Sequence, residues 1–210
     1  MWFLEVVASM FFVDLLSGIV HMYLDYQVIE DETLKNHVEK NIPAIIQFET
    51  TPTFVNASSW DQFLWDFQIH HQVPYPSAVS EGELMMQIAR PVFVPYVASV
   101  CAYAGGYVDG PCTRIWLMAL TLSPFVQFTH FASHKRMQGK MTGIYAVVAW
   151  LQDAGVLLSA SAHKSHHETY DRNFCIFNGW ANVIVNPLSR MLYVKKIDKV
   201  ECPVVNSYKK

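Results

Sequence analysis

The sequence predicts an all-α integral membrane protein, built as a single domain over residues 1–210. Hydrophobic residues make up 52% of the chain and charged residues only 16%, whereas a typical soluble domain has about 25% charged residues. The apolar residues also gather into four stretches, at 2–20, 91–108, 115–131 and 144–161, each close to the ~20 residues that cross a ~30 Å hydrocarbon core. The net charge of −3 predicts no nucleic-acid partner.

The first three stretches are predicted to cross the membrane. Residues 2–20 lack the basic start and the small-residue cleavage site of a signal peptide, so they are predicted as a helix that stays in the bilayer. Residues 25–83 form the longest polar stretch, and its aromatic residues and prolines predict an ordered cap over the membrane. The stretches 91–108 and 115–131 are predicted to form a hairpin through the short turn at 109–114.

Eight of the nine histidines fall into four compact groups at the ends of apolar stretches. The groups are His21 with Asp25, His70 with His71, His130 with His134, and His163 with His166 and His167. Residues four apart on a helix share a face, so such spacing directs two side chains toward one point. Ionisable groups beside transmembrane segments mark functional sites by default, and imidazole is the commonest metal ligand. The sequence therefore predicts a shared metal site. His37 lies in a polar stretch outside every group and is assigned no role.

The ligand count indicates two metal ions. Eight histidines and one carboxylate, that of Asp25, are too many for one ion and fit two ions with open positions; Asp25 is expected to be a ligand rather than a partner of one. A structural zinc site needs only four ligands and favours cysteine, and the four cysteines lie outside the histidine groups, without a C-x-x-C pair. Imidazole-rich sites suit iron, copper, zinc or nickel. Iron able to activate dioxygen beside lipid is the economical assignment.

Charge and ligand spacing together predict the topology. Residues 134–140 form the most basic short loop, which the positive-inside rule places in the cytosol or its equivalent, as it does the lysine-rich tail at 195–210. If the fourth stretch crossed straight, its ~18 residues would carry His163 about 27 Å from His134. Metal ligands cannot be so far apart. The fourth stretch is therefore predicted to lie in the interface or to re-enter, which gives about three crossings, one interfacial helix and a cytosolic-side cap carrying the metal site.

These motifs resemble those of the lipid desaturase family, which includes the Kua-type plasmanylethanolamine desaturases and the plastid desaturases that act on palmitate of phosphatidylglycerol. The matching stretches are DLLSGIVHMYLD (14–25), HHQVPYPSAV (70–79), HFASH (130–134), LQDAGVLLSASAHKSHHETY (151–170) and NFCIFNGWAN (173–182). The resemblance implies desaturation of a fatty or ether-linked chain on an intact glycerophospholipid. It also implies iron, dioxygen and an electron donor such as cytochrome b5 or ferredoxin, and with the ligand count this gives two iron ions. The membrane would be that of the endoplasmic reticulum or a plastid, with the site on its cytosolic or stromal side.

Further residues are expected to support this chemistry. Removing hydrogen from an unactivated methylene needs an oxidant that side chains cannot supply and a metal–oxygen centre can. Asp153 and Asp14 are each expected to accept the second N–H of a ligating histidine, which orients the ring. Candidates for lining the lipid channel, each equally well read as a lipid-facing or core residue, are Met85, Met86, Phe93, Trp116, Phe125 and Phe128. Residues that would frame the site or cap the last helix are Asn173, Asn178, Trp180 and Asn182.

Two other functions fit parts of the pattern. A membrane hydroxylase or sterol-type oxidase would use the same kind of histidine-bound metal with a different product. A metal transporter would also need clustered ligands, but its sites lie near the bilayer midplane on broken helices. The histidines here lie at the ends of apolar stretches, which argues against transport.

Overall fold

The structure is a computed structural model and describes residues 2–27, 58–71, 81–169 and 171–194. Within these ranges the regular elements are helical and no strand occurs, as the sequence predicts. The helices are α1 (Trp2–Asp25), α3 (Ser59–Gln68), α4 (Glu81–Ala104), α5 (Pro111–Leu122), α6 (Phe125–Met137), α7 (Ile144–Asp153), α8 (Ala160–Thr169) and α9 (Asn182–Ser189). A 3-10 turn, η1 (Ile69–His71), and a π-helical turn, η2 (Arg190–Val194), follow α3 and α9. Most of the predicted polar cap and all of the lysine-rich tail, with His37, lie outside the described residues.

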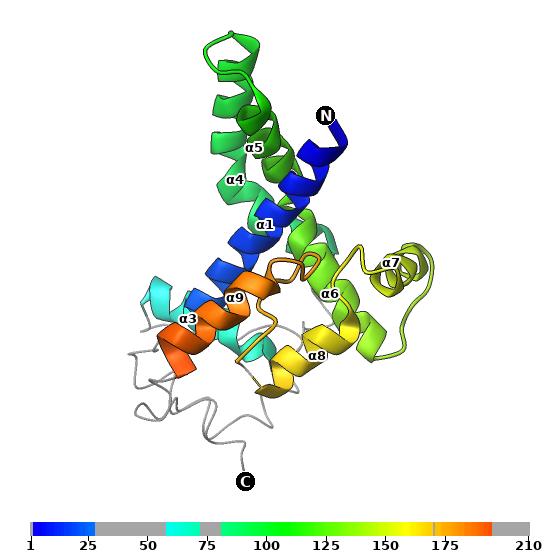
Figure 1. The fold of residues 1–210 in the computed structure, drawn as a ribbon. Coiled ribbons are helices and arrows are strands. Elements are labelled where there is room, and N and C mark those ends of the chain that lie inside the picture. The colour runs from blue at the N-terminus through cyan, green and yellow to red at the C-terminus, as the bar shows by residue number, and fades with distance from the viewer. Residues whose placement is uncertain (1, 28–57, 72–80, 170, 195–210) are drawn as a thin grey trace.

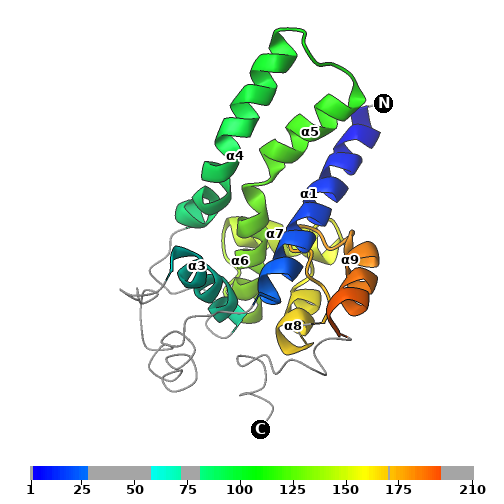
Figure 2. The same cartoon turned by 90° about the vertical axis from the view of Figure 1, so that its left-hand side faces the viewer.

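The helices divide into an arm and a base. Helices α1, α4 and α5 run together into the arm, while α3, α6, α7, α8 and α9 gather at its lower end (Figures 1 and 2). Helix α4 ascends the arm and α5 returns beside it (Figure 2), so the predicted hairpin is confirmed. Helix α1 packs along α5 and carries the chain from part-way up the arm to the base (Figure 1).

Helix α1 buries several polar side chains and leaves many of its apolar side chains exposed, although Val13, Met22 and Leu24 are buried. Glu5, Ser9, Asp14 and His21 are buried against the rest of the protein, whereas Trp2, Phe3, Leu4 and Val20 are among the exposed residues. Within the most apolar 18-residue stretch of α1, only 28% is buried inside the protein. A helix in water would bury its apolar face instead. This arrangement is that of a helix whose outer face meets lipid.

Among the described residues, α1 is the one helix that is long and apolar enough to cross a membrane. If α5 and α6 together form a single bent span, there are two such spans. The pair α5 and α6 is bent by 45° at the break between them. Helix α4 has the length of a span, but it contains Pro91 and Pro95 and begins in a polar segment with Glu83 and Arg90. The predicted number of about three crossings thus stays a prediction.

The fourth apolar stretch does not form one straight helix. Helix α7 ends at Asp153, and the turn that follows contains Gly155 at a φ of 70°, a conformation that glycine adopts at no steric cost. The backbone N–H of Leu158 then donates to the carbonyl of Phe177 (3.0 Å), and α8 begins at Ala160. The break returns the chain to α6, so His163 and His134 lie together, as their shared chemistry required.

Candidate metal centre

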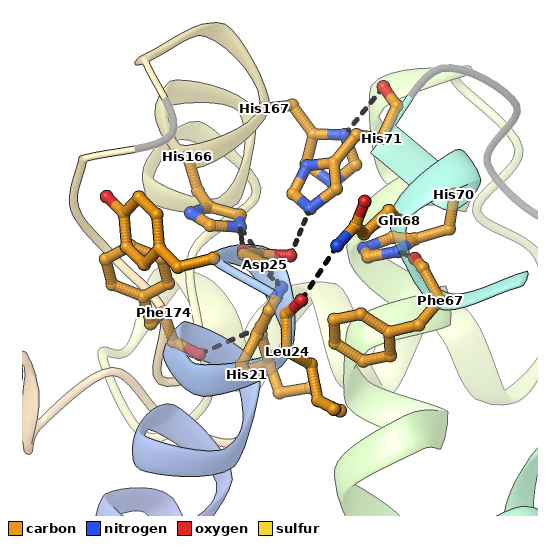
Figure 3. Close-up of polar contacts among 12 residues, drawn as sticks. His21, Leu24, Asp25, Phe67, Gln68, His70, His71, His166, His167 and Phe174 are labelled. Carbon is orange, nitrogen blue, oxygen red and sulfur yellow. Dashed lines mark hydrogen bonds and ion pairs between the residues drawn. The ribbon is translucent and has the colours of Figure 1, made fainter. Parts of the chain in front are cut away.

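Four elements bring all nine predicted ligands to one place in the base of the molecule. The last turn of α1 contributes His21 and Asp25, η1 contributes His70 and His71, α6 contributes His130 and His134, and α8 contributes His163, His166 and His167. Figure 3 shows the part of the cluster around Asp25, where side chains from α1, η1 and α8 point toward one another. Segments up to 145 residues apart in the sequence meet here.

The first subset, which we call the four-imidazole group, consists of His130, His134, His163 and His167. One ring nitrogen of each lies within 4.8 Å of the others. The Nε2 atom of His163 is 3.0 Å from Nε2 of His134 and 3.0 Å from Nε2 of His167. Nε2 of His134 is in turn 3.2 Å from Nε2 of His130. Four ring nitrogens therefore face a common centre.

The second subset, which we call the carboxylate group, consists of His21, Asp25, His71 and His166. Nε2 of His21 lies 3.1 Å from Nε2 of His166, and Oδ2 of Asp25 is 3.4 Å from each of them. Oδ1 of Asp25 is 2.9 Å from Nε2 of His71. The ninth residue, His70, lies between the two groups, with its ring centroid 4.2 Å from that of His71 and 5.1 Å from that of His130.

Backbone carbonyls determine which ring nitrogen of several histidines carries hydrogen. A carbonyl oxygen can only accept, so the nitrogen facing it must be the donor. Nδ1–H of His21 donates to the carbonyl of Phe174 (3.0 Å), and Nδ1–H of His166 donates to that of Arg172 (2.7 Å). Nδ1–H of His167 donates to the carbonyl of His71 (3.1 Å), and His70 makes the same kind of bond to Phe67. In their neutral forms these rings present bare Nε2 lone pairs to the interior of the cluster.

Such an arrangement fits bound cations. Two Nε2 lone pairs 3.1 Å apart, on His21 and His166, repel each other, and two protonated rings at that distance would repel more strongly. In the four-imidazole group, Nε2 of His163 has two imidazole neighbours, yet a ring nitrogen has at most one hydrogen to donate. Nε2 of His70 is buried without a hydrogen-bond partner in the part of the chain that the structure describes, and a ring nitrogen of His70 lies within 4.8 Å of one of His71 and one of His167. A metal ion in each group would satisfy the Nε2 lone pairs that converge there.

Burial holds the ring nitrogens in the form that binds metal. Removal from water disfavours the charged imidazolium. Burial, reinforced by the neighbouring rings, lowers the pKa of His71 and of His163 well below the usual value, and lowers the pKa of His167 to about 3. Burial also lowers the pKa of His70. Neutral imidazole is the ligand form, so no deprotonation is needed for an ion to enter at neutral pH.

Comparison with known proteins decides the family. The family model of the lipid desaturase domain matches residues 53–198, well over half of the chain. The chain belongs to the lipid desaturase family. A search of curated proteins found no match, and neither did a search of solved structures. Family membership makes the chain an oxidoreductase of lipid metabolism that works in a membrane context.

Within this desaturase, Asp153 and Asp14 do not occupy the places expected from the sequence. The side chain of Asp153 is 67% exposed and accepts a hydrogen bond from Arg136 (2.6 Å) in place of one from a histidine. It is the last residue of α7, where its charge is solvated. Asp14 is fully buried, but backbone N–H groups near Gly179 surround it instead of an imidazole.

Asp153→Asn is therefore expected to retain most of the desaturase activity. Loss of a partner that orients a ligating histidine typically costs about 10–100-fold in affinity or activity, and Asp153 has no such contact. An exposed ion pair such as that with Arg136 is worth about 0–1 kcal/mol, so stability should change little. Product yield per amount of expressed protein measures the effect, and a fall of ten-fold or more would contradict this placement.

The sequence reasoning missed the groups that hold the rings. Apart from Oε1 of Gln127, which lies 3.2 Å from Nδ1 of His130, these are backbone carbonyls, which every residue has and which leave no mark in the sequence. Asn173 and Asn182 do frame the segment that carries two of them: Nδ2 of Asn173 donates to the carbonyl of Ala162, and Oδ1 of Asn182 accepts from the N–H of Cys175.

The residues expected to line a lipid channel lie mostly on the outside. Those at least 38% exposed are Met86, Phe93, Trp116 and Phe125. Phe128 stacks on Tyr145 from α7, with 5.6 Å between ring centroids, and Met85 is half-buried. The exposed positions fit the lipid-facing alternative. The stretch after His71, from 72 to 80, lies outside the described residues.

Proposed function

We propose that the protein introduces a double bond into a fatty or ether-linked chain of a glycerophospholipid. It would use two iron ions held by the eight clustered histidines and Asp25, with dioxygen as co-substrate. The observation that carries the proposal is the convergence of ring nitrogens in two main groups, one with four imidazoles and one with a carboxylate, with His70 between them. An imidazole-rich pair of sites suits iron. The protein would lie in a membrane of the endoplasmic reticulum or a plastid, with its metal site on the cytosolic or stromal side.

The residues of the chain contribute orientation and exclusion of water. Bound iron would supply the oxidant, derived from dioxygen, that breaks an unactivated C–H bond. Carbonyl acceptors fix the rings of His21 and His166, so little reorganisation is needed when an ion binds. The ring of Phe174, fully buried, packs its edge against His166 with 4.9 Å between centroids, and Phe67 packs similarly against His21. These aromatic rings keep water from the carboxylate group.

Electron balance requires a partner. Removing two hydrogens from the lipid chain releases two electrons and two protons, whereas reduction of dioxygen to two waters takes four electrons and four protons. The remaining two electrons must come from outside the lipid. We therefore propose an external donor such as cytochrome b5 or ferredoxin, which would supply them one at a time.

Cells that express the protein are expected to contain phospholipid species two mass units lighter than those of cells without it. The new double bond removes two hydrogens from one chain, so mass spectrometry with fragmentation locates it on the acyl or the ether-linked chain. Expression of an inactive variant, His163→Ala, is the control. A species sixteen mass units heavier in place of the lighter one would show a hydroxylase and refute desaturation.

Cysteines placed at Gln138 and at Lys164 are expected to be labelled from the same side of the membrane. The fourth apolar stretch breaks after Asp153 and returns to the histidine cluster, so we propose that it does not cross, and both residues are exposed. The background lacks Cys101, Cys112 and Cys202, while buried Cys175 stays. A cysteine at Tyr107, which is 86% exposed at the tip of the arm, is the control and should be labelled from the opposite side. If the cysteines at positions 138 and 164 were labelled from opposite sides of the membrane, this topology would be excluded.

A further inference from the structure

The connection between α8 and α9 carries the two carbonyls that aim the rings of the carboxylate group. From Asp171 to Ala181 the chain runs past α1, α6 and α8. Within it, the carbonyls of Arg172 and Phe174 accept the Nδ1–H groups of His166 and His21. We call residues 172–181 the carbonyl segment. The direction in which both rings face depends on the position of this segment.

One buried carboxylate holds the far end of the carbonyl segment. Oδ1 of Asp14 accepts the backbone N–H groups of Phe177 (3.1 Å), Asn178 (2.9 Å) and Gly179 (3.1 Å). Its Oδ2 accepts the N–H of Ala181 (2.9 Å). The side chain is fully buried at the middle of α1, where an unsolvated charge is costly. Four charge-assisted hydrogen bonds offset that cost only if the segment keeps this one conformation.

Asn173 fixes the near end of the same segment. It lies between the two carbonyl residues and has a φ of 60°, in the left-handed region that asparagine tolerates better than most residues. Its N–H donates to Oδ1 of Asn186 on α9 (2.8 Å), and its Nδ2 donates to the carbonyl of Ala162 on α8 (3.1 Å). The segment is thus held at both ends, and its close approach to α1 leaves no room at Gly18, where an added Cβ would lie 2.3 Å from Sγ of Cys175.

We infer that Asp14 is a positioning residue for the carboxylate group: by fixing the carbonyl segment from within α1, it sets the orientation of His21 and His166. Asp14 contacts neither ring and is not itself a ligand. His130, His134, His163 and His167 make none of their ring hydrogen bonds to carbonyls of this segment, in so far as the structure describes them. The rings whose hydrogen bonds depend directly on this segment are therefore those of the carboxylate group, while the segment meets α6 through the hydroxyl of Thr129, which donates to the carbonyl of Ile176 (3.0 Å). This inference rests on the proposed function only where metal is concerned.

Amide hydrogen exchange of the metal-free protein tests the inference first. Asp14→Asn removes the charge and places an NH₂ group against a backbone N–H, so exchange in peptides covering 172–181 is expected to become at least ten-fold faster. Glu5→Gln is the matched control, because Glu5 is another buried carboxylate of α1, bound to Arg114 (2.7 Å) at the opposite end of the helix. It should leave exchange in the segment unchanged. Equal exchange in both variants would overturn the inference. This result does not depend on metal, so it stands even if the proposed function fails.

Metal analysis tests the second half. Asp14→Asn loaded with iron is expected to retain about half of the wild-type iron, with the spectroscopic signal of the four-imidazole group preserved. Asn186→Ala, which loosens the near end without removing a buried charge, should show the same selective loss to a smaller degree, and it replaces Asp14→Asn if that variant does not fold. Loss of both ions together, or of neither, in a folded variant would overturn the positioning role.

Discussion

Replacing His166 by alanine is expected to abolish product formation. His166 is fully buried, and its Nε2 lies 3.1 Å from that of His21 and 3.4 Å from Oδ2 of Asp25. Without its imidazole the carboxylate group loses a central ligand. Loss of a partner in the outer hydrogen-bonding layer already costs about 10–100-fold, so loss of a ligand should lower product by more than ~100-fold. Mass spectrometry of phospholipids, in cells with equal amounts of each variant, measures the effect.

The same loss is expected for every clustered histidine, and a matched control is present in the chain. The eight positions are His21, His70, His71, His130, His134, His163, His166 and His167. His37→Ala is the control, since His37 lies in a charged stretch outside the groups, and it should retain nearly full activity. If His37→Ala were as inactive as His166→Ala, or if several clustered histidines proved dispensable, the eight-histidine site would be wrong.

Purified protein is expected to contain about two irons per chain, as two groups of ligands predict, and to lose both when three residues of α8 are changed together. The triple replacement of His163, His166 and His167 by alanine removes ligands from both groups, because His163 and His167 face the four-imidazole group and His166 faces the carboxylate group. His163→Ala alone should remove about one ion. Elemental analysis after reconstitution with ferrous iron gives the numbers.

Lys164→Ala is the matched control for the metal measurement. Lys164 lies on the same helix, its side chain is 64% exposed, and it pairs only loosely with Glu168 (3.7 Å). It should bind as much iron as the wild type. A stoichiometric zinc content without any uptake of iron would refute the desaturase chemistry, even if the ligands were correctly identified.

The clustering of the nine candidate ligands could be predicted from the sequence because it depends on residue type and spacing. Histidine has few other reasons to recur beside apolar helices, and a spacing of four residues, as in His130 and His134, fixes a shared helical face. The helical fold and the α4–α5 hairpin follow from apolar stretches and a short turn for the same local reasons. The need to bring His163 near His134 also predicted that the fourth stretch would not cross straight.

Roles that depend on contacts across the chain could not be predicted in this way. Asp153 and Asp14 both interrupt apolar stretches, and the sequence treats them alike. In the structure Asp153 faces outward onto Arg136, while Asp14 is enclosed by the backbone of residues 177–181. The difference arises from the direction in which each helix face points, and only packing fixes that direction.

Residue types and their spacing predicted an all-helical lipid desaturase with nine clustered candidate ligands, because histidine chemistry and helical periodicity are both local properties of a chain. The tertiary structure decided how those ligands divide into a four-imidazole group and a carboxylate group, and which nitrogen each ring presents. For His166 and His21 that nitrogen depends on the carbonyls of Arg172 and Phe174, which belong to the backbone. Since every residue has the same carbonyl, only its position in space distinguishes one that orients a histidine from one that does not.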